Sequence, residues 1–507
     1  MLALVLLTWS CQPESQSFDL LIINAQVLDG SGAKEQALDV GILGDTIAWI
    51  GKRHKGIEAL KTLDAKGMYL TPGFIDPHTH ALRDLRHPER KSNVNYLTQG
   101  VTTVVVGNDG GGPVKTAAAM AELDSAGIGT NAAFMVGHNS IRRQVMRNDK
   151  RAPNAEEMEE MKKMVRSGME AGALGLSSGL FYAPASFSET EEVIELAKVA
   201  GEYGGYYDVH MRDESSYNIG LLGAVKETIE IARKANVPGN IAHVKALGVD
   251  VWGQSKEIIE LIESARAEGL VITADQYPFE ASSTSLAAAL IPRWVMADAI
   301  NYRSRLDDPL LLDSIKSGME ENLRRRGGPE AVLFIAAADT TVNGRTLAEV
   351  ADLRQLSPVE AAIMVEKSGG SAIASFNMQD SDIKALMAQP WVMTSSDGGS
   401  PHPRKYASFP RKIQKYVLQE GVLSLAEMVH RSTAFTAQSI GITKRGSIQE
   451  GYFADLIVFD PAEVNAKSTY AEPVQLSEGI SYVVLNGKVV MENGAYNETL
   501  AGRCLRK

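Results

Sequence analysis

Short, almost entirely apolar segments alternate with longer segments of helical periodicity through most of this chain. Residues 73–76, 101–106 and 131–137 are examples of the apolar segments. Strands of parallel sheets are buried on both faces and appear as continuous apolar runs, whereas helices carry apolar residues three and four positions apart. Eight strand-plus-helix units fit into residues 71–445. The pattern therefore predicts an α/β fold with a (β/α)8 TIM barrel over this range.

Both ends of the chain show a different pattern, with short strands separated by turns. The strand-like segments are residues 20–28, 37–43, 46–51, 453–459 and 482–492. The last of them contains Asn486-Gly487 between two apolar runs, which is a strong signal for a two-residue hairpin. We predict a small β-sandwich domain built from both chain ends, residues 18–70 and 446–500.

The alternation of strands and helices is interrupted before the last predicted barrel strand. Residues 285–345 form a long segment that contains RSRLDDPLLLDSIKSGMEENLRRR, in which apolar residues recur at helical spacing. We predict a helical insertion within the barrel over this range.

Residues 1–17 predict a lipoprotein signal or tether. The apolar run MLALVLLTWS is followed by Cys11 and a polar segment, an order that resembles the end of a bacterial lipoprotein signal. The run is too short to span a membrane, so attachment would come only from a lipid on Cys11. This interpretation places the protein in the periplasm or tethered to a membrane. The run lacks a basic segment before it, and the alternative is a cytoplasmic protein with a frayed N-terminus.

Composition narrows the range of functions. The 507 residues carry a net charge of −11 without any run rich in Lys and Arg, which argues against a nucleic-acid partner. The chain has only two cysteines, Cys11 and Cys504, which lie near its ends. They cannot form a disulfide framework or a cysteine-rich zinc site. A metal ion would therefore be held by His, Asp or Glu.

Histidines and an aspartate follow several of the predicted barrel strands. His78 and His80 end the segment GFIDPHTH, and positions i and i+2 of a strand face the same side. His210, His243 and Asp397 end later apolar runs, and barrel enzymes gather reactive groups at the carboxyl ends of their strands. Imidazole and carboxylate ligands favour zinc, although other divalent ions also accept them. We predict a catalytic metal site at this end of the barrel.

A series of longer motifs indicates the kind of metal-dependent protein that this chain resembles. In chain order they are GFIDPHTH, VTTVVVGNDG, GHNSIRRQVM, LSSGLFYAPAS, DVHMRDE, IAHVKALG, DQYPFEASSTSL and SDGGSPHPRKYASFPR. Together they resemble the D-aminoacylase (N-acyl-D-amino-acid deacylase) family of the amidohydrolase superfamily, from about residue 19 to about residue 495. The His-x-His pair marks only the superfamily, whereas HMRDE together with PHPRKYASFPR is specific to this branch. The resemblance implies a TIM barrel of the amidohydrolase type.

The resemblance also implies a metal centre with two positions. His78 and His80 would hold the α metal, and His210 and His243 would hold the β metal. The family places a cysteine between these positions, and this chain has Asp109 there. A carboxylate can bridge two metal ions but is a harder ligand than thiolate. The number of zinc ions, one or two per chain, therefore stays open.

The reaction implied is amide hydrolysis. A metal-bound hydroxide would attack the acyl carbonyl, and Asp397, which would also touch the metal, would act as general base and then general acid. Tyr182 would polarise the carbonyl, and Arg404 would bind the substrate's α-carboxylate through its guanidinium fork. The other residues implied to contact the substrate are Lys245, Tyr277 and Ser283.

The implied substrates are N-acyl-D-amino acids, extending to dipeptides with a C-terminal D-residue. The loop from Asp397 to Arg404 is shorter than in typical family members, and Val244 stands where the family often has histidine, so the side-chain preference stays open. One alternative is a cyclic amidase of the dihydroorotase or hydantoinase kind, which would lack the HMRDE and PHPR motifs. Another is a non-catalytic barrel that acts as a scaffold. The sequence gives no indication of the oligomeric state.

Overall fold

The computed structural model describes residues 16–297, 301–399 and 401–507. Cys11 and the remainder of the predicted lipoprotein segment up to residue 15 lie outside the described residues. Residues 16 and 17, which that prediction included, begin the first strand. Within the described ranges, no helix is both long enough and apolar enough to cross a membrane.

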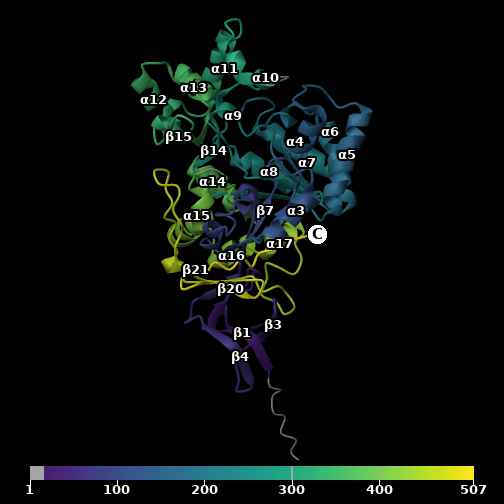
Figure 1. The fold of residues 1–507 in the computed structure, drawn as a ribbon, viewed down its shortest axis with the longest axis vertical. Coiled ribbons are helices and arrows are strands. Elements are labelled where there is room, and N and C mark those ends of the chain that lie inside the picture. Colours follow the sequence, from purple (N-terminus) through teal and green to yellow (C-terminus); the bar gives the residue numbers. More distant parts are fainter. Residues whose placement is uncertain (1–15, 298–300, 400) are drawn as a thin grey trace, which may run out of the picture.

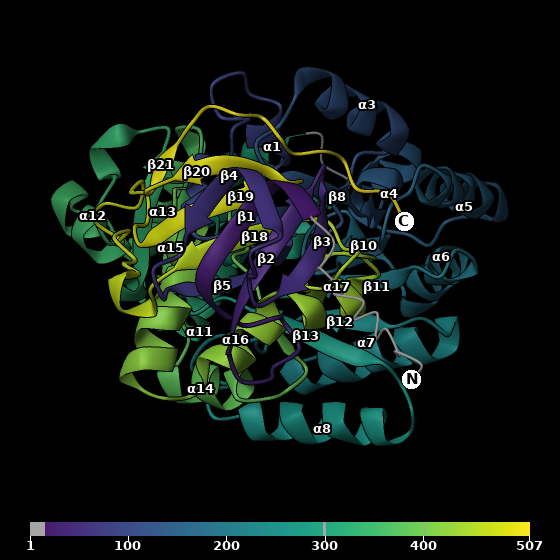
Figure 2. The same cartoon turned by 90° about the horizontal axis from the view of Figure 1, so that it is seen from below.

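Both ends of the chain contribute strands to one sheet of nine strands. Its order is β21-β20-β19-β18-β5-β1-β2-β3, and β4 pairs with β1 as a branch. These strands are β1 (Gln16–Val27), β2 (Gln36–Leu43), β3 (Thr46–Gly51), β4 (Ile57–Asp64), β5 (Tyr69–Pro72), β18 (Leu456–Phe459), β19 (Ile480–Leu485), β20 (Lys488–Glu492) and β21 (Ala495–Tyr496). Figure 2 shows the yellow strands β19 to β21 beside the purple strands. The predicted hairpin is confirmed, because Asn486 and Gly487 join β19 to β20 and have φ angles of 48° and 77°.

Apolar side chains from the two chain ends share one buried cluster in this sheet. Leu20, Ile22 and Val40 come from the N-terminal strands, and Leu456 and Val484 come from the C-terminal strands. Burying a side chain of this size contributes about 1.5–3 kcal/mol. This shared burial explains why β5 and β18, whose paired residues lie 384–390 positions apart, join the two chain ends.

Parallel strands follow one another in chain order through the middle of the molecule. They are β6 (Phe74–Thr79), β7 (Val101–Val106), β8 (Asn131–Phe134), β9 (Val136–Gly137), β10 (Gly175–Gly179), β11 (Tyr206–His210), β12 (Gly239–Ile241), β13 (Ile272–Gln276) and β17 (Val392–Thr394). β8 pairs with β7 and β9 pairs with β10, and only Met135 separates β8 from β9. The last strand segment lies beside the first, because the amide of Asp397 donates to the His78 carbonyl at 2.9 Å.

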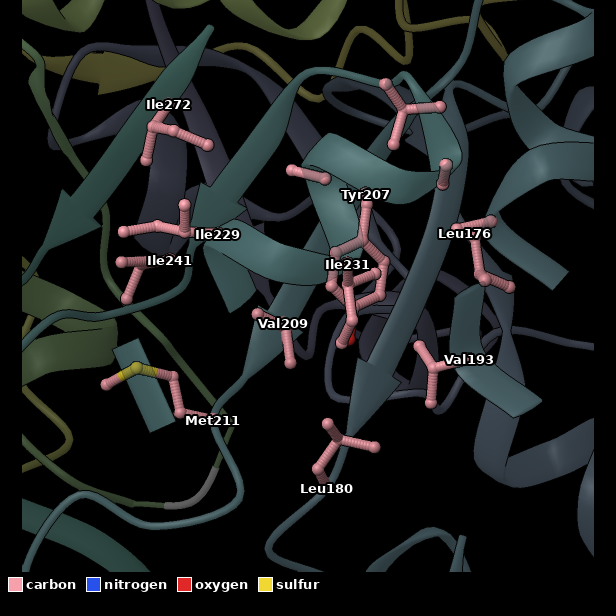
Figure 3. Packing of buried hydrophobic residues seen from close by; sticks show 14 of the residues in the cluster. Leu176, Leu180, Val193, Tyr207, Val209, Met211, Ile229, Ile231, Ile241 and Ile272 are labelled. Atoms are coloured by element: carbon pink, nitrogen blue, oxygen red, sulfur yellow. The ribbon is translucent and has the colours of Figure 1, made fainter. Parts of the chain in front are cut away.

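Helices cover the outside of these parallel strands (Figure 1). They are α1 (Leu82–Leu85), α2 (Val94–Leu97), α3 (Thr116–Ala126), α4 (His138–Met146), α5 (Ala155–Glu170), η1 (Ala185–Phe187), α6 (Thr190–Glu202), α7 (Leu221–Ala235), α8 (Ser255–Ala267), α14 (Asp380–Met387), α15 (Arg404–Arg411), the π-helix η5 (Lys412–Gln419), α16 (Leu425–Ser432), α17 (Ala434–Ile440) and η6 (Pro461–Glu463). Figure 3 shows Leu176, Val209 and Ile241 of the strands packed with Val193 and Ile229 of the helices. The strands thus bury their outer face against amphipathic helices.

The inserted segment, residues 281–376 between β13 and β17, differs from the predicted helical insertion over residues 285–345. Its elements are β14 (Ala281–Ser285), α9 (Leu286–Leu290), α10 (Arg293–Met296), η2 (Tyr302–Asp307), α11 (Leu312–Arg325), η3 (Pro329–Ala331), β15 (Val332–Ala337), η4 (Thr340–Val342), α12 (Leu347–Arg354), α13 (Pro358–Lys367) and β16 (Ser371–Phe376). The strands form an antiparallel sheet in the order β14-β16-β15. The prediction missed this sheet because β14 (ASSTS) and β16 (SAIASF) lack alternating large apolar residues.

This inserted segment lies at the opposite end of the molecule from strands β1 to β4 (Figure 1). It has its own apolar cluster, which includes Ile315, Phe334, Val350 and Ile373. The C-terminal residues also run beyond the predicted limit at residue 500. The backbone of Cys504 forms an isolated β-bridge with that of Ala132, and the Cys504 side chain is buried. The end of the chain therefore packs beside β8.

Candidate metal centre and substrate cavity

His78 and His80 lie side by side at the end of β6, as their spacing predicts. Their ring centroids are 5.8 Å apart. His78 is buried, whereas His80 is partly exposed. The Nε2 atom of His78 lies 3.2 Å from Asp109 Oδ1, and the Nε2 atom of His80 lies 3.4 Å from Asp109 Oδ2. Both imidazoles therefore face one carboxylate.

Asp109 reaches this position from the glycine-rich loop after β7. Its φ angle is 53°, in the left-handed region. The neighbouring Gly110 has a φ of 70°, and a Cβ atom there would lie 1.9 Å from Asn139 Oδ1. Only glycine lets the loop pack this closely against α4. The loop thus directs the Asp109 carboxylate inward, where its Oδ1 atom has no hydrogen-bond partner among the described residues.

His210 and His243 face the same carboxylate from the ends of β11 and β12. His210 Nδ1 and His243 Nε2 lie 2.9 Å apart, at 3.7 Å and 3.5 Å from Asp109 Oδ1. His210 is the last residue of β11, and His243 follows β12 with a φ of 36°. Asp109 therefore lies among four imidazoles that come from three different parts of the chain.

Asp397 lies on the other side of the cluster, next to His80 and His78. Its Oδ1 atom lies 3.1 Å from His80 Nε2 and 3.8 Å from His78 Nε2. Asp397 also has a left-handed backbone, with a φ of 47°. Asp109, His243 and Asp397 thus share a conformation that is uncommon for residues with a side chain. Such conformations concentrate at functional sites, where the surrounding structure holds them in place.

The side chains of the cluster provide the ligand atoms that a metal ion needs. His78, His80, Asp109 and Asp397 offer one set of atoms within 4.8 Å of one another, and Asp109, His210 and His243 offer a second. His78 Nε2 and Asp109 Oδ1 are buried without hydrogen-bond partners among the described residues. Unpartnered buried polar atoms are costly, and coordination would satisfy them. Nitrogen and carboxylate oxygen donors fit zinc.

The two carboxylates interact electrostatically with the histidines of the cluster and with Arg404. Burial alone would lower the pKa of His80, but Asp109 and Asp397 outweigh it and raise this pKa to about 9. Burial alone would raise the pKa of Asp397, but the Arg404 guanidinium and His243 hold it well below its ordinary value. Asp397 is therefore ionised at neutral pH, the state in which a carboxylate binds a metal ion.

A cavity of about 570 Å³ opens beside the cluster. All the residues that the sequence analysis connected with the substrate line it, namely Tyr182, Lys245, Tyr277, Ser283, Asp397 and Arg404. The Arg404 guanidinium lies 2.9 Å from Asp397 Oδ2 and 4.7 Å from the centre of the Tyr277 ring. Its Nε and Nη1 atoms have no hydrogen-bond partner among the described residues, which leaves two donors for a ligand.

Glu214 is part of the site and was missed from sequence. Its carboxylate pairs with Lys245 and lies 3.1 Å from His243 Nδ1. Burial alone would raise the pKa of Glu214, but Lys245 and the two histidines hold it well below its ordinary value. The signal was present, because Glu214 follows His210 by four residues within the HMRDE motif. Glu214 fixes both Lys245 and the ring of His243.

A second missed group consists of buried polar residues on neighbouring parallel strands, next to His78. Asn240 donates to Asp208 and Asp275 at 2.9 Å and 2.7 Å, and Asn108 donates to Asp208 at 3.0 Å. Asp208 Oδ2 lies 4.0 Å from His78 Nδ1, and burial raises the pKa of Asp208 to about 6. This polar layer supports the first histidine from behind.

The remaining histidine motifs have structural surroundings. His138 lies 2.8 Å from Glu192, which also pairs with Arg142, and all three side chains are buried. His402 accepts a hydrogen bond from the Arg404 amide at 3.1 Å and so helps to hold α15. Neither histidine belongs to a possible metal-binding group among the described residues.

Comparisons with known proteins identify the family to which this chain belongs. The amidohydrolase family model matches residues 61–291 and 313–491. The chain belongs to the amidohydrolase family. It is 34% identical to a D-aminoacylase from Alcaligenes xylosoxydans xylosoxydans over 98% of this chain and 99% of that protein. Among solved structures, a D-aminoacylase described with a binuclear metal centre is 31% identical, with a TM-score of 0.83 and coverage of 97% of this chain and 100% of that chain.

A second solved relative was captured with a reaction mimic. It is the N-acyl-D-glutamate deacylase of Bordetella bronchiseptica, complexed with zinc and a phosphonate inhibitor that mimics the tetrahedral intermediate. It is 29% identical to this chain, with a TM-score of 0.82 and coverage of 97% and 100%. The three relatives therefore match this chain over nearly its whole length.

Proposed function

We propose that this protein is a zinc-dependent hydrolase that removes the acyl group from N-acyl-D-amino acids. The observation that carries the proposal is the position of Asp397, between the imidazole cluster and Arg404. A proton-transferring carboxylate and a carboxylate-binding guanidinium thus lie in one cavity wall. The D-configuration is supported by the relatives, which are a D-aminoacylase and an N-acyl-D-glutamate deacylase.

The metal-binding residues divide into two positions that share Asp109. His78 and His80 with Asp397 would hold one zinc ion, and His210 and His243 would hold the other. When bound, zinc supplies a Lewis acid for the acyl carbonyl and lowers the pKa of a water molecule. Elemental analysis of the zinc-loaded enzyme, compared with its activity, tests whether one or both positions are filled.

The residues of the chain account for binding and proton transfer. Arg404 donates through its free Nε and Nη1 atoms to the substrate's carboxylate, with Lys245, Tyr277 and Ser283 around it. Asp397, held ionised, accepts a proton from the attacking water and returns it to the leaving amine. Burial raises the pKa of Tyr182, so its hydroxyl stays protonated and donates to the acyl oxygen.

The same cavity wall supports a wider substrate range. A dipeptide with a C-terminal D-residue presents the same carboxylate and the same amide bond, and we include such dipeptides in the proposal. A lipid on Cys11 would place this activity at a membrane surface, in the periplasm, where D-residue peptides of the cell wall would be within reach. Mass spectrometry of the mature protein from its natural host tests this location, and an intact, unlipidated N-terminus contradicts it.

We further propose that the parallel strands form a complete (β/α)8 barrel over residues 71–445 and that the nine-stranded sheet is a separate β-sandwich domain. The chain-order pairing of β6 to β13, with β17 beside β6, supports the barrel. The apolar cluster shared by both chain ends supports the sandwich. A crystal structure tests both assignments directly.

The activity is tested with purified protein that is stripped by a chelator and reloaded with zinc. The panel contains N-acetyl-D-methionine, its L-enantiomer, a D-residue dipeptide, a hydantoin and dihydroorotate. We expect hydrolysis of the D-compounds alone, dependent on added metal. Preferential hydrolysis of a cyclic amide would support a cyclic amidase, and a protein that no divalent ion activates would support a non-catalytic scaffold.

A further inference from the structure

The substrate cavity is also lined by a cationic side chain that the proposed reaction does not use. Arg326, which caps the C-terminus of α11, lines the same cavity as Arg404 and Lys245. Its relative exposure is 1%. The inserted segment between β13 and β17 thus supplies a buried guanidinium to a cavity whose metal-binding residues come from the parallel strands.

Arg326 differs from the other cations of the cavity in having no acidic partner. Lys245 pairs with Glu214, and Arg404 pairs with Asp397. Among the described residues, no carboxylate lies within ion-pair distance of Arg326, and its Nε atom is buried without a hydrogen-bond partner. With the Asn377 amide turned so that its oxygen faces Arg326, that oxygen accepts from Nη1 at 3.1 Å.

The surroundings compensate the charge of Arg326 only in part. The guanidinium lies 5.9 Å from the centre of the Tyr217 ring, which provides a weak cation–π attraction. The C-terminus of α11 contributes about half a negative charge, shared with solvent. A buried charge without a full partner is costly to maintain, and an anionic ligand in the cavity would complete the compensation.

A hydroxyl group close to Arg326 is also available to a ligand. Tyr217 lines the same cavity, and its Oη atom is buried without a partner among the described residues. A hydroxyl group and a guanidinium together offer several hydrogen-bond donors, the set that a carboxylate accepts. The unpartnered groups of Arg326 and Tyr217 therefore point to the same ligand chemistry.

We infer that Arg326, with Tyr217, binds a second carboxylate of the substrate. This inference rests on the proposed function, in which Arg404 binds the first carboxylate. The preferred substrates are then N-acyl-D-amino acids with two carboxylates. The second carboxylate belongs either to an acidic side chain, as in D-glutamate, or to a dicarboxylic acyl group, such as succinyl.

Matched substrate pairs test the inference and distinguish the two sources. Each pair compares a carboxylate with the amide of the same shape: N-acetyl-D-glutamate with N-acetyl-D-glutamine, and N-succinyl-D-alanine with N-succinamoyl-D-alanine. We expect zinc-loaded enzyme to favour the carboxylate in one of these pairs by at least about 10-fold in kcat/KM, as expected for one charge-assisted hydrogen-bonded contact. The pair that shows the preference identifies the source.

Variants assign the preference to Arg326. Arg326→Met should abolish the preference for the carboxylate and leave the amide substrates within about threefold of wild type. Arg326→Lys should retain part of it, because the charge is kept but the fork is lost. Arg324→Met is the matched control, since Arg324 is exposed and pairs with Asp250 and Glu321; it should retain the full preference.

The outcomes separate this inference from the proposed function. Hydrolysis of all four compounds with no preference for charge overturns the inference and leaves the proposed function standing. Equal losses on all four compounds in Arg326→Met also overturn it, because they indicate a structural role. If none of the four compounds is hydrolysed, calorimetric titration of the same compounds decides. Tighter binding of a carboxylate than of its matched amide, lost in Arg326→Met, supports the inference. Equal binding of the carboxylate and the amide overturns it.

Discussion

The Arg404 guanidinium lies 2.9 Å from the carboxylate of Asp397, so the residue assigned to hold the substrate also touches the residue assigned to move the proton. His402 holds the backbone of Arg404, and the Ser283 carbonyl accepts from Arg404 Nη2 at 3.2 Å. Substrate binding at Arg404 is therefore linked structurally to the position and charge of Asp397.

Replacing Arg404 tests this link. Arg404→Ala should raise KM for N-acetyl-D-methionine by about 10- to 100-fold, because one charge-assisted contact is lost. If Arg404 only bound the carboxylate, amides without a carboxylate would be spared. The ion pair with Asp397 changes that expectation, and kcat for such amides should fall as well. Arg411→Ala is the control, since Arg411 lies on the same helix but pairs with Glu280. Unchanged turnover of neutral amides would contradict the link.

Asp397 should be essential for turnover but not for folding. We expect Asp397→Asn to lower kcat by about 10²- to 10⁴-fold, the usual contribution of general acid–base catalysis. Steady-state kinetics, together with metal analysis of the same sample, checks the prediction. Near-normal turnover with zinc still bound would remove Asp397 from its assigned role.

Asp109 should be needed for metal binding, because its carboxylate lies among all four imidazoles. We expect Asp109→Ala to lose at least one bound zinc ion per chain when it is measured by elemental analysis after dialysis. Asp250→Ala provides the control, since Asp250 is a surface carboxylate that pairs with Arg324. Wild-type zinc content and activity in Asp109→Ala would exclude Asp109 as a ligand.

The buried group of His138, Arg142 and Glu192 should contribute to stability rather than to catalysis. Glu192→Ala leaves the buried Arg142 guanidinium without its ion-pair partner. Removing one member of a buried ion pair destabilises a protein by about 3–5 kcal/mol. Urea unfolding should show this loss, whereas Glu195→Ala on the surface of the same helix should change stability by less than about 1 kcal/mol. A stable but inactive Glu192→Ala would indicate a catalytic role.

Lys412 should make stability depend on pH. Burial lowers the pKa of Lys412 to about 7 from an ordinary value of 10.5. Between these values the unfolded chain binds a proton that the folded protein lacks, so Lys412 adds up to about 1.4 kcal/mol of stability per pH unit as pH rises. Below pH 7 both states are protonated, and this dependence ends.

The stability of wild type relative to Lys412→Met should therefore increase from pH 7 to pH 10, as measured by urea unfolding at several pH values. Lys415→Met is the matched control, because Lys415 is partly exposed and pairs with Asp380 and Glu280. Parallel pH profiles for wild type and Lys412→Met would show that Lys412 is charged in the folded protein.

The sequence predicted the residues of the metal cluster because one simple rule governs their placement. Side chains at the carboxyl ends of parallel strands converge, so His78, His80, His210 and His243 could be grouped from strand positions alone. Asp109 and Asp397 follow their strands by three residues in left-handed conformations. Their inward direction depends on the loops. Strand position indicated Asp397 as well, whereas the role of Asp109 as a ligand came from the motif resemblance.

Other features depend on tertiary contacts that leave no local pattern. β14 and β16 consist largely of Ser and Ala, and only their pairing makes them strands. Arg326 reaches the cavity from the end of a helix in the inserted segment, and its sequence context, a run of three arginines, is typical of a solvent-exposed helix end. Glu214 was visible in a motif, but its pairing with Lys245 required the structure.

The central claim is that four imidazoles and two carboxylates hold zinc at the carboxyl ends of the parallel strands. Anomalous diffraction from a crystal soaked in zinc, recorded at the zinc edge, tests it most directly. We predict one or two strong peaks at about 2.0–2.2 Å from nitrogen atoms of His78, His80, His210 or His243 and from Asp109 oxygen atoms. An absence of peaks there, with zinc found only at surface residues, would contradict the claim.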